Sequence, residues 1–339
     1  MMIHSNAQDF QTAPQKPGVT QTRLLHEFVA ASWDNDAKPA MENSGTPVSF
    51  RDLKARSGQI ANFLIAHGIQ SGNIVAIRQN WSVDLFASIL GILEAGAAYV
   101  VIDPALTVAK ADEKIKKSTA RLVLGTTSLP ALPEIDEVRT LEIDAVPDSL
   151  KALTAPVSFA GRRRPVPSRS SSLVCNPGSD NASIKHNDAV RLSKSIAKLY
   201  SVNENSRCYH DASVAFDIAV EEALSMISSG ATLVLDRSGV DGSHDLAEFV
   251  EKQRITHLSA TPDIMAEIDE DCPTLEVLIL GGKKSPAGLV AKWAIRTGLV
   301  VSIKHSGDRF PSYRMEQESR TASRPCLIFA RTANRYAHG

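Results

Sequence analysis

Short apolar runs alternate with amphipathic stretches from residue 20 to about 305, and this alternation is the strongest constraint on the fold. NIVAIRQ (73–79) and AAYVVID (97–103) are almost continuously apolar and are predicted to be buried strands. SVDLFASILGILEAG (82–96), which lies between them, has the length and apolar spacing of a helix. Buried strands separated by helices are typical of a parallel sheet covered on both faces, so we expect an α/β fold.

Several helix boundaries can be predicted from single residues. In TPVSFRDLKARSGQIANFLIAHGI, Ser49 and Asp52 have the spacing of a capping box at the start of a helix. Gly68 suits the end of that helix, because a left-handed residue is favoured there. Gly96 and Gly230 are predicted to end two further helices in the same way.

The alternation divides into two blocks. We predict a first α/β subdomain over residues 20–150 and a second over 171–305. Residues 151–170 are rich in Pro, Ser and Arg and are predicted to form a linker or long surface loop. Residues 1–19 are expected to be a disordered lead-in, and 306–339 an irregular tail in which only CLIFA is clearly apolar.

The composition excludes several classes of function. The 339 residues are 43% hydrophobic and 22% charged with a net charge of −1, so no overall charge favours nucleic acid or an anionic membrane. No apolar run approaches the roughly 20 residues that cross a bilayer, and the N-terminus lacks the pattern of a signal peptide. The four cysteines form no C-x-x-C pair, which favours buried free thiols over a metal site or disulfides. We therefore expect a cytoplasmic protein with no nucleic-acid or membrane partner.

Four segments, in order, resemble motifs of the adenylation domains of nonribosomal peptide synthetases, which are part of the adenylate-forming (AMP-binding) superfamily. They are VSFRDLKARSGQIANFLIAHGIQSGNIVAI, ILGILEAGAAYVVIDP (89–104), FDIAVEEALSMISSGATLVL (216–235) and LEVLILGGKKSP (275–286). The second is very similar to the family motif LKAGAAYVPLDP. The similarity spans roughly residues 20–305.

The resemblance implies two stacked, mostly parallel α/β subdomains, which form the large N-terminal part of adenylate-forming enzymes. It also implies a reaction in which a carboxylate attacks the α-phosphate of ATP, giving an acyl adenylate and pyrophosphate. Relatives then pass the acyl group to a thiol, usually on a carrier protein, and Mg²⁺ neutralises phosphate charge during activation. The family's C-terminal domain, which contributes a lysine to adenylation, is expected to be missing here. Neither Lys292 nor Lys304 lies in a context to replace that lysine.

By the same resemblance, CNPGSDNASIKHND follows a strand where the family has the phosphate loop YTSGSTGxPKG. Gly178 and Ser179 are kept as predicted ATP-binding residues, and Lys185 is nearby but out of register. Asp180 and Asn181 stand where Thr and Gly are expected. A carboxylate about 4 Å from a phosphate charge costs about 4 kcal/mol at an effective dielectric constant of about 20. We interpret the loop as a damaged or repurposed phosphate cradle.

A second family motif, N-x-Y-G-P-T-E, corresponds to IKHSGDRF in this chain. His305 falls at the tyrosine that stacks near adenine and could still stack there. Arg309 falls at the glutamate that helps to hold magnesium, and an arginine cannot ligate a cation. Asp308, at the position of the threonine, is an alternative magnesium ligand one residue early.

The GGKKSP stretch keeps Gly281 and Gly282 as predicted nucleotide-binding residues, with Lys283 in place of a glutamate. All of these departures affect residues that would contact ATP or Mg²⁺, whereas the scaffold motifs are intact. This pattern favours loss of ATP chemistry over random decay of the whole chain. The same departures count against binding of ATP and Mg²⁺, the cofactors that the resemblance implies.

Substrate recognition is better preserved. Asp217 occupies the position of the aspartate that holds the substrate's α-ammonium in amino-acid-activating relatives. Aspartate is also favoured at a helix N-terminus for reasons unrelated to a substrate. The resemblance further assigns to the side-chain pocket Ile218, Glu221, Ser259, Ile279, Gly281, Lys304, Ser312 and Tyr313. Glu221 favours a basic or polar side chain on the substrate, unless Lys304 neutralises it.

Three functions remain open from the sequence. The first is an enzyme that activates an amino acid or another carboxylic acid in secondary-metabolite biosynthesis, with a carrier protein or synthetase as partner. The second is a non-catalytic module that binds a ligand or a synthetase partner. The third is a truncated remnant without a biochemical role. We expect adenylation to be impaired in the isolated chain.

Overall fold

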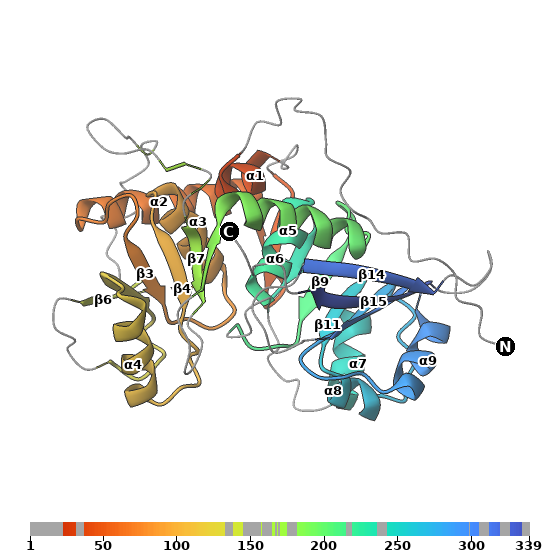
Figure 1. The fold of residues 1–339 in the computed structure, drawn as a ribbon. Helices are drawn as coiled ribbons and strands as arrows, with labels where there is room; N and C mark the ends of the chain where they lie inside the picture. Colours follow the sequence, from red (N-terminus) through yellow and green to blue (C-terminus); the bar gives the residue numbers. More distant parts are fainter. Residues whose placement is uncertain are drawn as a thin grey trace.

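The computed structural model describes residues 23–31, 37–132, 138–144, 157, 165–166, 168, 170–174, 182–214, 219–235, 243–297, 299–304, 312–318 and 326–333. These residues form a mixed α/β structure with two sheets that are mostly parallel (Figure 1). The expected fold class is therefore confirmed. In this described part of the chain, no helix has the length and apolar character needed to cross a bilayer.

The smaller sheet has six strands. They are β3 (Ile74–Ile77), β4 (Ala98–Val101), β5 (Leu122–Gly125), β6 (Arg139–Glu142), β7 (Ser170–Val174) and β8 (Ala182–Lys185). Their order is β6-β5-β3-β4-β7-β8, and only β7 and β8 pair in antiparallel fashion.

The larger sheet has nine strands. They are β1 (Pro39–Asn43), β2 (Thr46–Ser49), β9 (Arg207–His210), β10 (Thr232–Val234), β11 (His257–Ala260), β12 (Val277–Leu280), β13 (Leu299–Lys304), β14 (Ser312–Glu318) and β15 (Cys326–Ala333). Their order is β14-β15-β13-β12-β11-β9-β10-β1-β2. Only the outermost pair at each edge is antiparallel.

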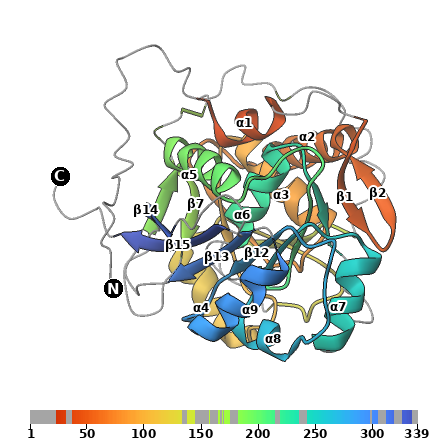
Figure 2. The ribbon, with the colours of Figure 1, turned by 90° about the vertical axis from the view of Figure 1, so that its right-hand side faces the viewer.

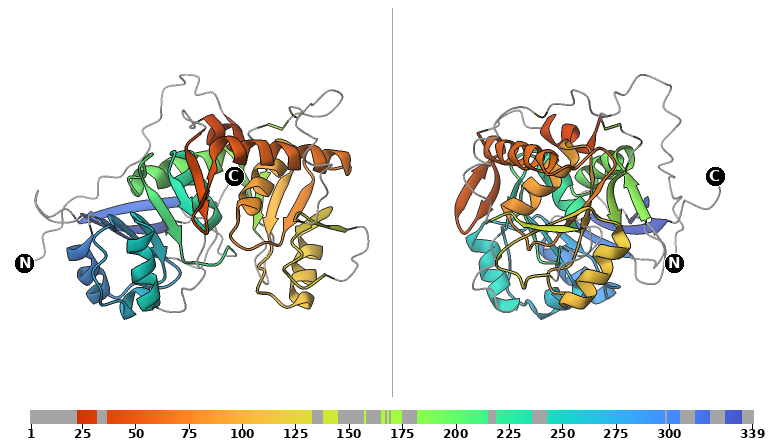
Figure 3. Two further views of the ribbon diagram at one scale, coloured as in Figure 1. Left: turned by 180° about the vertical axis from the view of Figure 1, so that it is seen from behind. Right: turned by 90° about the vertical axis from the view of Figure 1, so that its left-hand side faces the viewer.

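Helices cover both faces of each sheet. They are α1 (Leu25–Ala31), α2 (Phe50–Ala66), α3 (Val83–Glu94), α4 (Val108–Ser118), α5 (His186–Leu199), α6 (Ala219–Ser228), α7 (Ser243–Lys252), α8 (Pro262–Glu267) and α9 (Ala287–Arg296). Helices α1, α2, α3, α5 and α6 share one apolar core with both sheets, and α5 and α6 lie between them in Figure 1. Helix α4 packs on the outer face of the smaller sheet, and α7, α8 and α9 on that of the larger one (Figures 2 and 3).

The predicted helix boundaries are confirmed. Asp52 N–H donates to Ser49 Oγ at 3.1 Å, and Ser49 N–H donates to Asp52 Oδ2 at 3.3 Å, which completes the capping box of α2. The three glycines expected to end helices all have left-handed backbone, with φ of +86° at Gly68, +84° at Gly96 and +80° at Gly230. These short-range signals act within one helical turn, so tertiary packing did not override them.

Strand pairing crosses the boundary predicted between the two sequence blocks. Strands β1 and β2 belong to the block 20–150 but join the larger sheet, where β1 pairs in parallel with β10. Strands β7 and β8 follow the predicted linker but join the smaller sheet, where β7 pairs with β4. Each sheet thus takes two strands from the other block, and the two are interlocked.

The structure also differs from the irregular tail expected over residues 306–339. Strands β14 and β15 form an antiparallel pair, and β15 pairs in parallel with β13 from Leu299 opposite Cys326 to Lys304 opposite Arg331. The physical reason is that β13 would otherwise end the sheet with unpaired backbone groups, and the apolar CLIFA run provides a partner strand.

The alternation of side chains along β12 shows how one strand serves two cores. Val277 and Ile279 belong to the inner core, which lies between the sheets. Leu278 and Leu280 belong to the outer core, which α7, α8 and α9 cover. Successive side chains of a strand point to opposite faces, so a continuous apolar run is what a strand buried on both faces requires.

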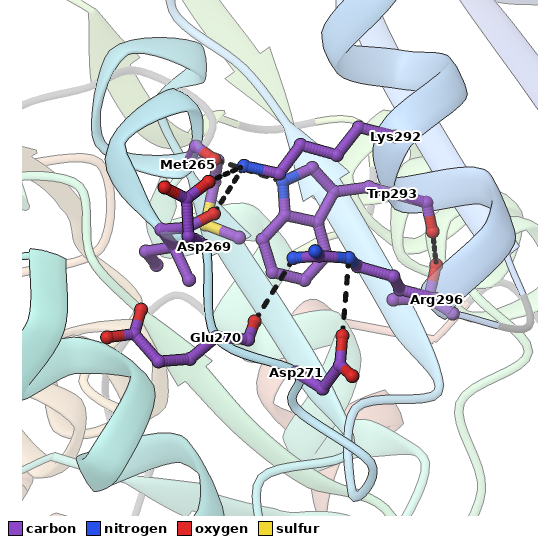
Figure 4. Close-up of polar contacts among 9 residues, drawn as sticks. Met265, Asp269, Glu270, Asp271, Lys292, Trp293 and Arg296 are labelled. Carbon is purple, nitrogen blue, oxygen red and sulfur yellow. Dashed lines mark hydrogen bonds and ion pairs between the residues drawn. The ribbon is translucent and has the colours of Figure 1, made fainter.

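A set of polar contacts fastens α9 to the end of α8, just before β12 (Figure 4). Lys292 Nζ donates to Ile268 O at 2.5 Å, and Trp293 Nε1 donates to Met265 O at 3.0 Å. The Arg296 guanidinium lies 5.5 Å from the centre of the Trp293 ring. Because these contacts link the segments before and after β12, they fix the position of the strand that carries part of the predicted substrate pocket.

We expect Gly91→Ala to destabilise the fold. Helix α3 approaches α2 closely at Gly91, where an added Cβ would lie 2.7 Å from Ser57 O and 3.0 Å from Ile60 Cβ. Overpacking of this kind costs about 1–3 kcal/mol, which outweighs the higher helix propensity of alanine. The free energy of unfolding in urea measures the loss. Gly288→Ala in α9 is the matched control, because an added Cβ there meets no atom within 4 Å and should add up to about 1 kcal/mol. Equal stability of the two variants would contradict this packing.

Buried ionisable side chains make stability depend on pH. Burial, and secondarily the charge of His186, lowers the pKa of His26 from 6.5 to about 3. Burial likewise lowers the pKa of His186 and of His257 to about 4. Burial raises the pKa of Glu94 from 4.5 to about 7, which acts in the opposite direction.

We expect the chain to lose stability as the pH falls from 7 towards 4. In this range the unfolded state takes up protons on three histidines that stay neutral in the folded state, and Glu94 offsets only one of them. The urea midpoint at a series of pH values measures the effect. His26→Leu should flatten the dependence, and a midpoint that rises on acidification would contradict it.

Candidate functional site

Three of the predicted pocket residues lie together at the carboxyl ends of the central strands of the larger sheet. Ser259 in β11 pairs in register with Ile279 in β12 on one side and with His210 in β9 on the other. Gly281 follows β12 directly and donates its N–H to Ala260 O at 3.1 Å. Ligands of open parallel sheets bind at this edge. The structure therefore brings Ser259, Ile279 and Gly281 together where a ligand is expected.

The site faces the inner layer of the molecule. Ile279 belongs to the inner core, and Ser259 contacts α6 through a hydrogen bond from its hydroxyl to Glu222 Oε2 at 3.2 Å. Helix α6 is the nearest wall of the site, and all of its residues from Ala219 to Ser228 are buried.

Two adjacent carboxylates of α6 face opposite sheets. Glu221, which the sequence assigned to the pocket, accepts a hydrogen bond from Tyr99 OH of β4 at 3.4 Å. Glu222 is directed towards the larger sheet, where it accepts hydrogen bonds from Ser259 and, at 2.5 Å, from Tyr200 OH. The carboxylate that contacts predicted pocket residue Ser259 is therefore Glu222, one position along from the assigned one.

His210 completes the cluster around Glu222. Its Nε2 lies 2.9 Å from Glu222 Oε2, and the two side chains are only 3% and 2% exposed. The two atoms are close, but the ring is not oriented for a well-aligned N–H···O hydrogen bond. Trp81 stacks on the imidazole with ring centres 5.6 Å apart and donates from Nε1 to Ala212 O at 2.8 Å. His210 Nδ1 is buried and has no hydrogen-bond partner among the described residues.

Glu222, Tyr200 and His210 were not identified from the sequence. The sequence of α6, AVEEALSMIS, did indicate buried carboxylates, because it is apolar apart from small polar residues and two adjacent glutamates. Two carboxylates that are both buried need separate partners. The partners themselves could not be named from local sequence, since Tyr200 and His210 come from other elements.

The predicted nucleotide-binding residues are only partly described. Around Gly281 an added Cβ would meet no atom within 4 Å, and Gly282 has a φ of +82° that favours glycine. The Lys283 ammonium forms an ion pair with Asp263, and both side chains are well exposed. The backbone after β12 thus leaves open space, while the charge of Lys283 is already partly compensated.

Lys185 lies at the far end of β8 from the predicted phosphate loop. It is exposed and pairs in register with Ser170, whereas Ala182 pairs with Val174 at the end next to the loop. Lys185 is three positions from Ala182 along an extended strand, so their Cα atoms are roughly 10 Å apart.

Lys304 is the last residue of β13, at the same sheet edge as Ser259. Ser312 and Tyr313 begin β14 at the edge of the larger sheet, where β15 and β13 separate them from β12, so the structure does not bring them next to Ile279. Six predicted residues lie outside the described part: Gly178, Ser179, Asp217, Ile218, His305 and Asp308.

The described residues do not fit a magnesium ion. Among them there is no group of three or more His, Cys, Asp and Glu side chains that could hold a metal. Arg309, which the sequence places at the position of the family's magnesium-binding glutamate, lies outside the described residues.

Comparison with known proteins adds independent information. Residues 29–175 match the family model AMP-binding, described as AMP-binding enzyme. Syringomycin synthase SyrB1 of Pseudomonas syringae pv. syringae is 28% identical over 302 residues, which is 85% of this chain and 47% of SyrB1. Bacitracin synthase 3 of Bacillus licheniformis is 27% identical over 282 residues, which is 81% of this chain and 4% of that protein. The chain thus spans less than half the length of these relatives.

A solved structure shows the same fold. The nonribosomal peptide synthetase FmoA3 in its α-methyl-L-serine-AMP bound form has a TM-score of 0.72 and 22% sequence identity. The superposition covers 83% of this chain and 33% of FmoA3. At this identity the similarity establishes the arrangement of helices and strands, which is the large α/β part expected from the sequence.

We expect Tyr200→Phe to destabilise the fold by about 1–3 kcal/mol, because it leaves the buried Glu222 Oε1 without its donor at 2.5 Å. Urea unfolding measures the loss. Ser228→Ala is a control on the same helix, since the Ser228 hydroxyl donates only to Ser225 O, a carbonyl within α6. A loss in Tyr200→Phe no larger than in this control would show that the hydroxyl does not stabilise Glu222.

Proposed function

Because the chain is related to the adenylation domains of nonribosomal peptide synthetases, we propose that it binds an amino acid or another small carboxylic acid for ATP-dependent activation. The product would be an acyl adenylate in secondary-metabolite biosynthesis, and a carrier protein or synthetase would be the partner. We further propose that adenylation is impaired in the chain alone. ATP would supply the α-phosphate that the carboxylate attacks.

One observation carries the acid-binding part of this proposal. Ser259 and Ile279 are register partners on the inner face at the carboxyl edge of the larger sheet, and open space adjoins Gly281. In this arrangement Ser259 and Ile279 would line the side chain of the acid. Asp217, which precedes α6 in the chain, would hold the α-ammonium of an amino acid.

The departures on the ATP side support impaired adenylation. Asp180 brings a negative charge into the predicted phosphate loop, and Arg309 replaces a predicted metal ligand. Lys283 stands where a glutamate is expected, which reverses the charge after the two glycines, and its ion pair with Asp263 partly compensates the new charge. The same ion pair favours a second candidate function, a non-catalytic module that binds the acid or a synthetase partner without activating it.

We expect the isolated chain to show no amino-acid-dependent exchange of pyrophosphate into ATP above a mock preparation. We also expect ATP with Mg²⁺ to leave the unfolding temperature unchanged, because the charges around the triphosphate are unfavourable. The matching acid should raise the unfolding temperature, since a ligand at about 100 times its Kd adds about 2.7 kcal/mol of stability. A panel of amino acids and small carboxylic acids identifies it.

Asp217→Ala is the matched variant for both assays. It should abolish the stabilisation by the acid without changing the unfolding temperature of the free chain. Exchange by the wild-type chain that Asp217→Ala abolishes would contradict the proposed impairment. If no acid in the panel stabilises the chain, the acid-binding proposal is wrong.

A further inference from the structure

We propose that Ser259 contacts the side chain of the bound acid only as a hydrogen-bond acceptor, so that the chain selects an acid whose side chain carries a hydrogen-bond donor. Hydroxyl, amide and ammonium side chains are the chemical classes that meet this requirement. The inference rests on the proposed function, because it needs an acid bound at the carboxyl edge of the larger sheet.

The single proton of the Ser259 hydroxyl is already taken by a hydrogen bond within the protein. A serine hydroxyl has one proton to donate and two lone pairs that accept. The Ser259 hydroxyl donates its proton to Glu222 Oε2 at 3.2 Å. Only the lone pairs remain for a ligand, so the ligand has to bring the proton of any hydrogen bond that it forms with Ser259.

Glu222 fixes the direction of its hydrogen bond with Ser259. An ionised carboxylate has acceptors only. Tyr200 OH donates to its Oε1 at 2.5 Å, and His210 Nε2 lies 2.9 Å from its Oε2. With its side chain only 2% exposed, Glu222 has no access to bulk water that could replace Ser259 as a partner.

One neighbouring residue adds a further polar atom to the site. His210 Nδ1 is buried and without a partner among the described residues. His210 is the register partner of Ser259 on β9, so this ring nitrogen belongs to the same site. Buried polar atoms without a protein partner are usually satisfied by water or a ligand.

Calorimetric titration of the whole 339-residue chain with paired probes tests the inference. The pairs are L-threonine with L-valine, L-glutamine with L-glutamate, and L-lysine with L-norleucine, in which only the first member carries the donor. We expect the donor-bearing member of the pair that fits the pocket to bind at least about tenfold more tightly, the equivalent of one net hydrogen bond.

Substitutions at Ser259 test which residue is responsible. Ser259→Ala should reduce the difference within the pair to less than about threefold, because no acceptor remains. Ser259→Thr keeps the hydroxyl and should keep the preference. Ser228→Ala removes a buried hydroxyl of α6 that does not contact Ser259 and should leave the preference unchanged.

Glu222→Gln provides a second test that does not depend on the Ser259 variants. The glutamine oxygen can still accept from Tyr200, and its amide nitrogen in the place of Oε2 would donate to Ser259 Oγ. The Ser259 proton would then be free for the ligand. We therefore expect L-glutamate, which can then accept from Ser259, to bind more tightly relative to L-glutamine than it does in the wild-type chain.

The outcomes separate this inference from the proposed function. If none of the six probes and no acid of the panel binds, the proposed function itself is wrong. If an acid binds without a preference for the donor, the inference is overturned and acid binding stands. The inference is also overturned if the preference persists in Ser259→Ala, or if Glu222→Gln folds, as circular dichroism reports, and leaves the ratio of the L-glutamine and L-glutamate affinities unchanged.

Discussion

The burial of helix α6 between two sheets is the constraint on which the rest of the structure depends. A helix without a solvent-exposed face has to be apolar or has to pair each polar group inside the protein. Helix α6 carries two adjacent carboxylates, Glu221 and Glu222, and each sheet provides the partners of one of them. Tyr99 of the smaller sheet contacts Glu221, and Ser259 of the larger sheet contacts Glu222. The helix thereby fixes the two sheets relative to each other and determines the wall of the candidate site.

The exchange of strands between the sequence blocks has the same consequence. Because β1 and β2 pair in the larger sheet and β7 and β8 in the smaller one, neither sheet is completed by a single continuous block of sequence. The inner core includes residues from both sheets and from five helices. The candidate site lies against this shared core, so its geometry depends on contacts that both blocks provide.

Local signals in the sequence predicted the elements well, because each depends on neighbouring residues. The capping box of Ser49 and Asp52 and the helix ends at Gly68 and Gly96 are examples. Sheet partners were not predictable in the same way, since the residues that pair β1 with β10 are about 190 positions apart and carry no local signal.

For the site, a resemblance to known motifs selected Ser259, Ile279 and Gly281, which the structure brings together at one sheet edge. It did not select Glu222 or His210, whose importance depends on which way a side chain points. The apolar pattern of α6 and of β12 predicts burial but does not say which face meets which sheet. That information arises only from the packing of the whole chain.

We propose that the edge of the larger sheet keeps its capacity to bind an acid, while the charges that would hold triphosphate and metal have been replaced. The most direct measurement is a crystal structure of the chain grown with its matching acid, ATP and Mg²⁺. We expect density for the acid over the side chains of Ser259 and Ile279, which are neighbours on adjacent strands, and no ordered nucleotide. Density for ATP or AMP next to Gly281 with a metal ion on its phosphates would contradict it.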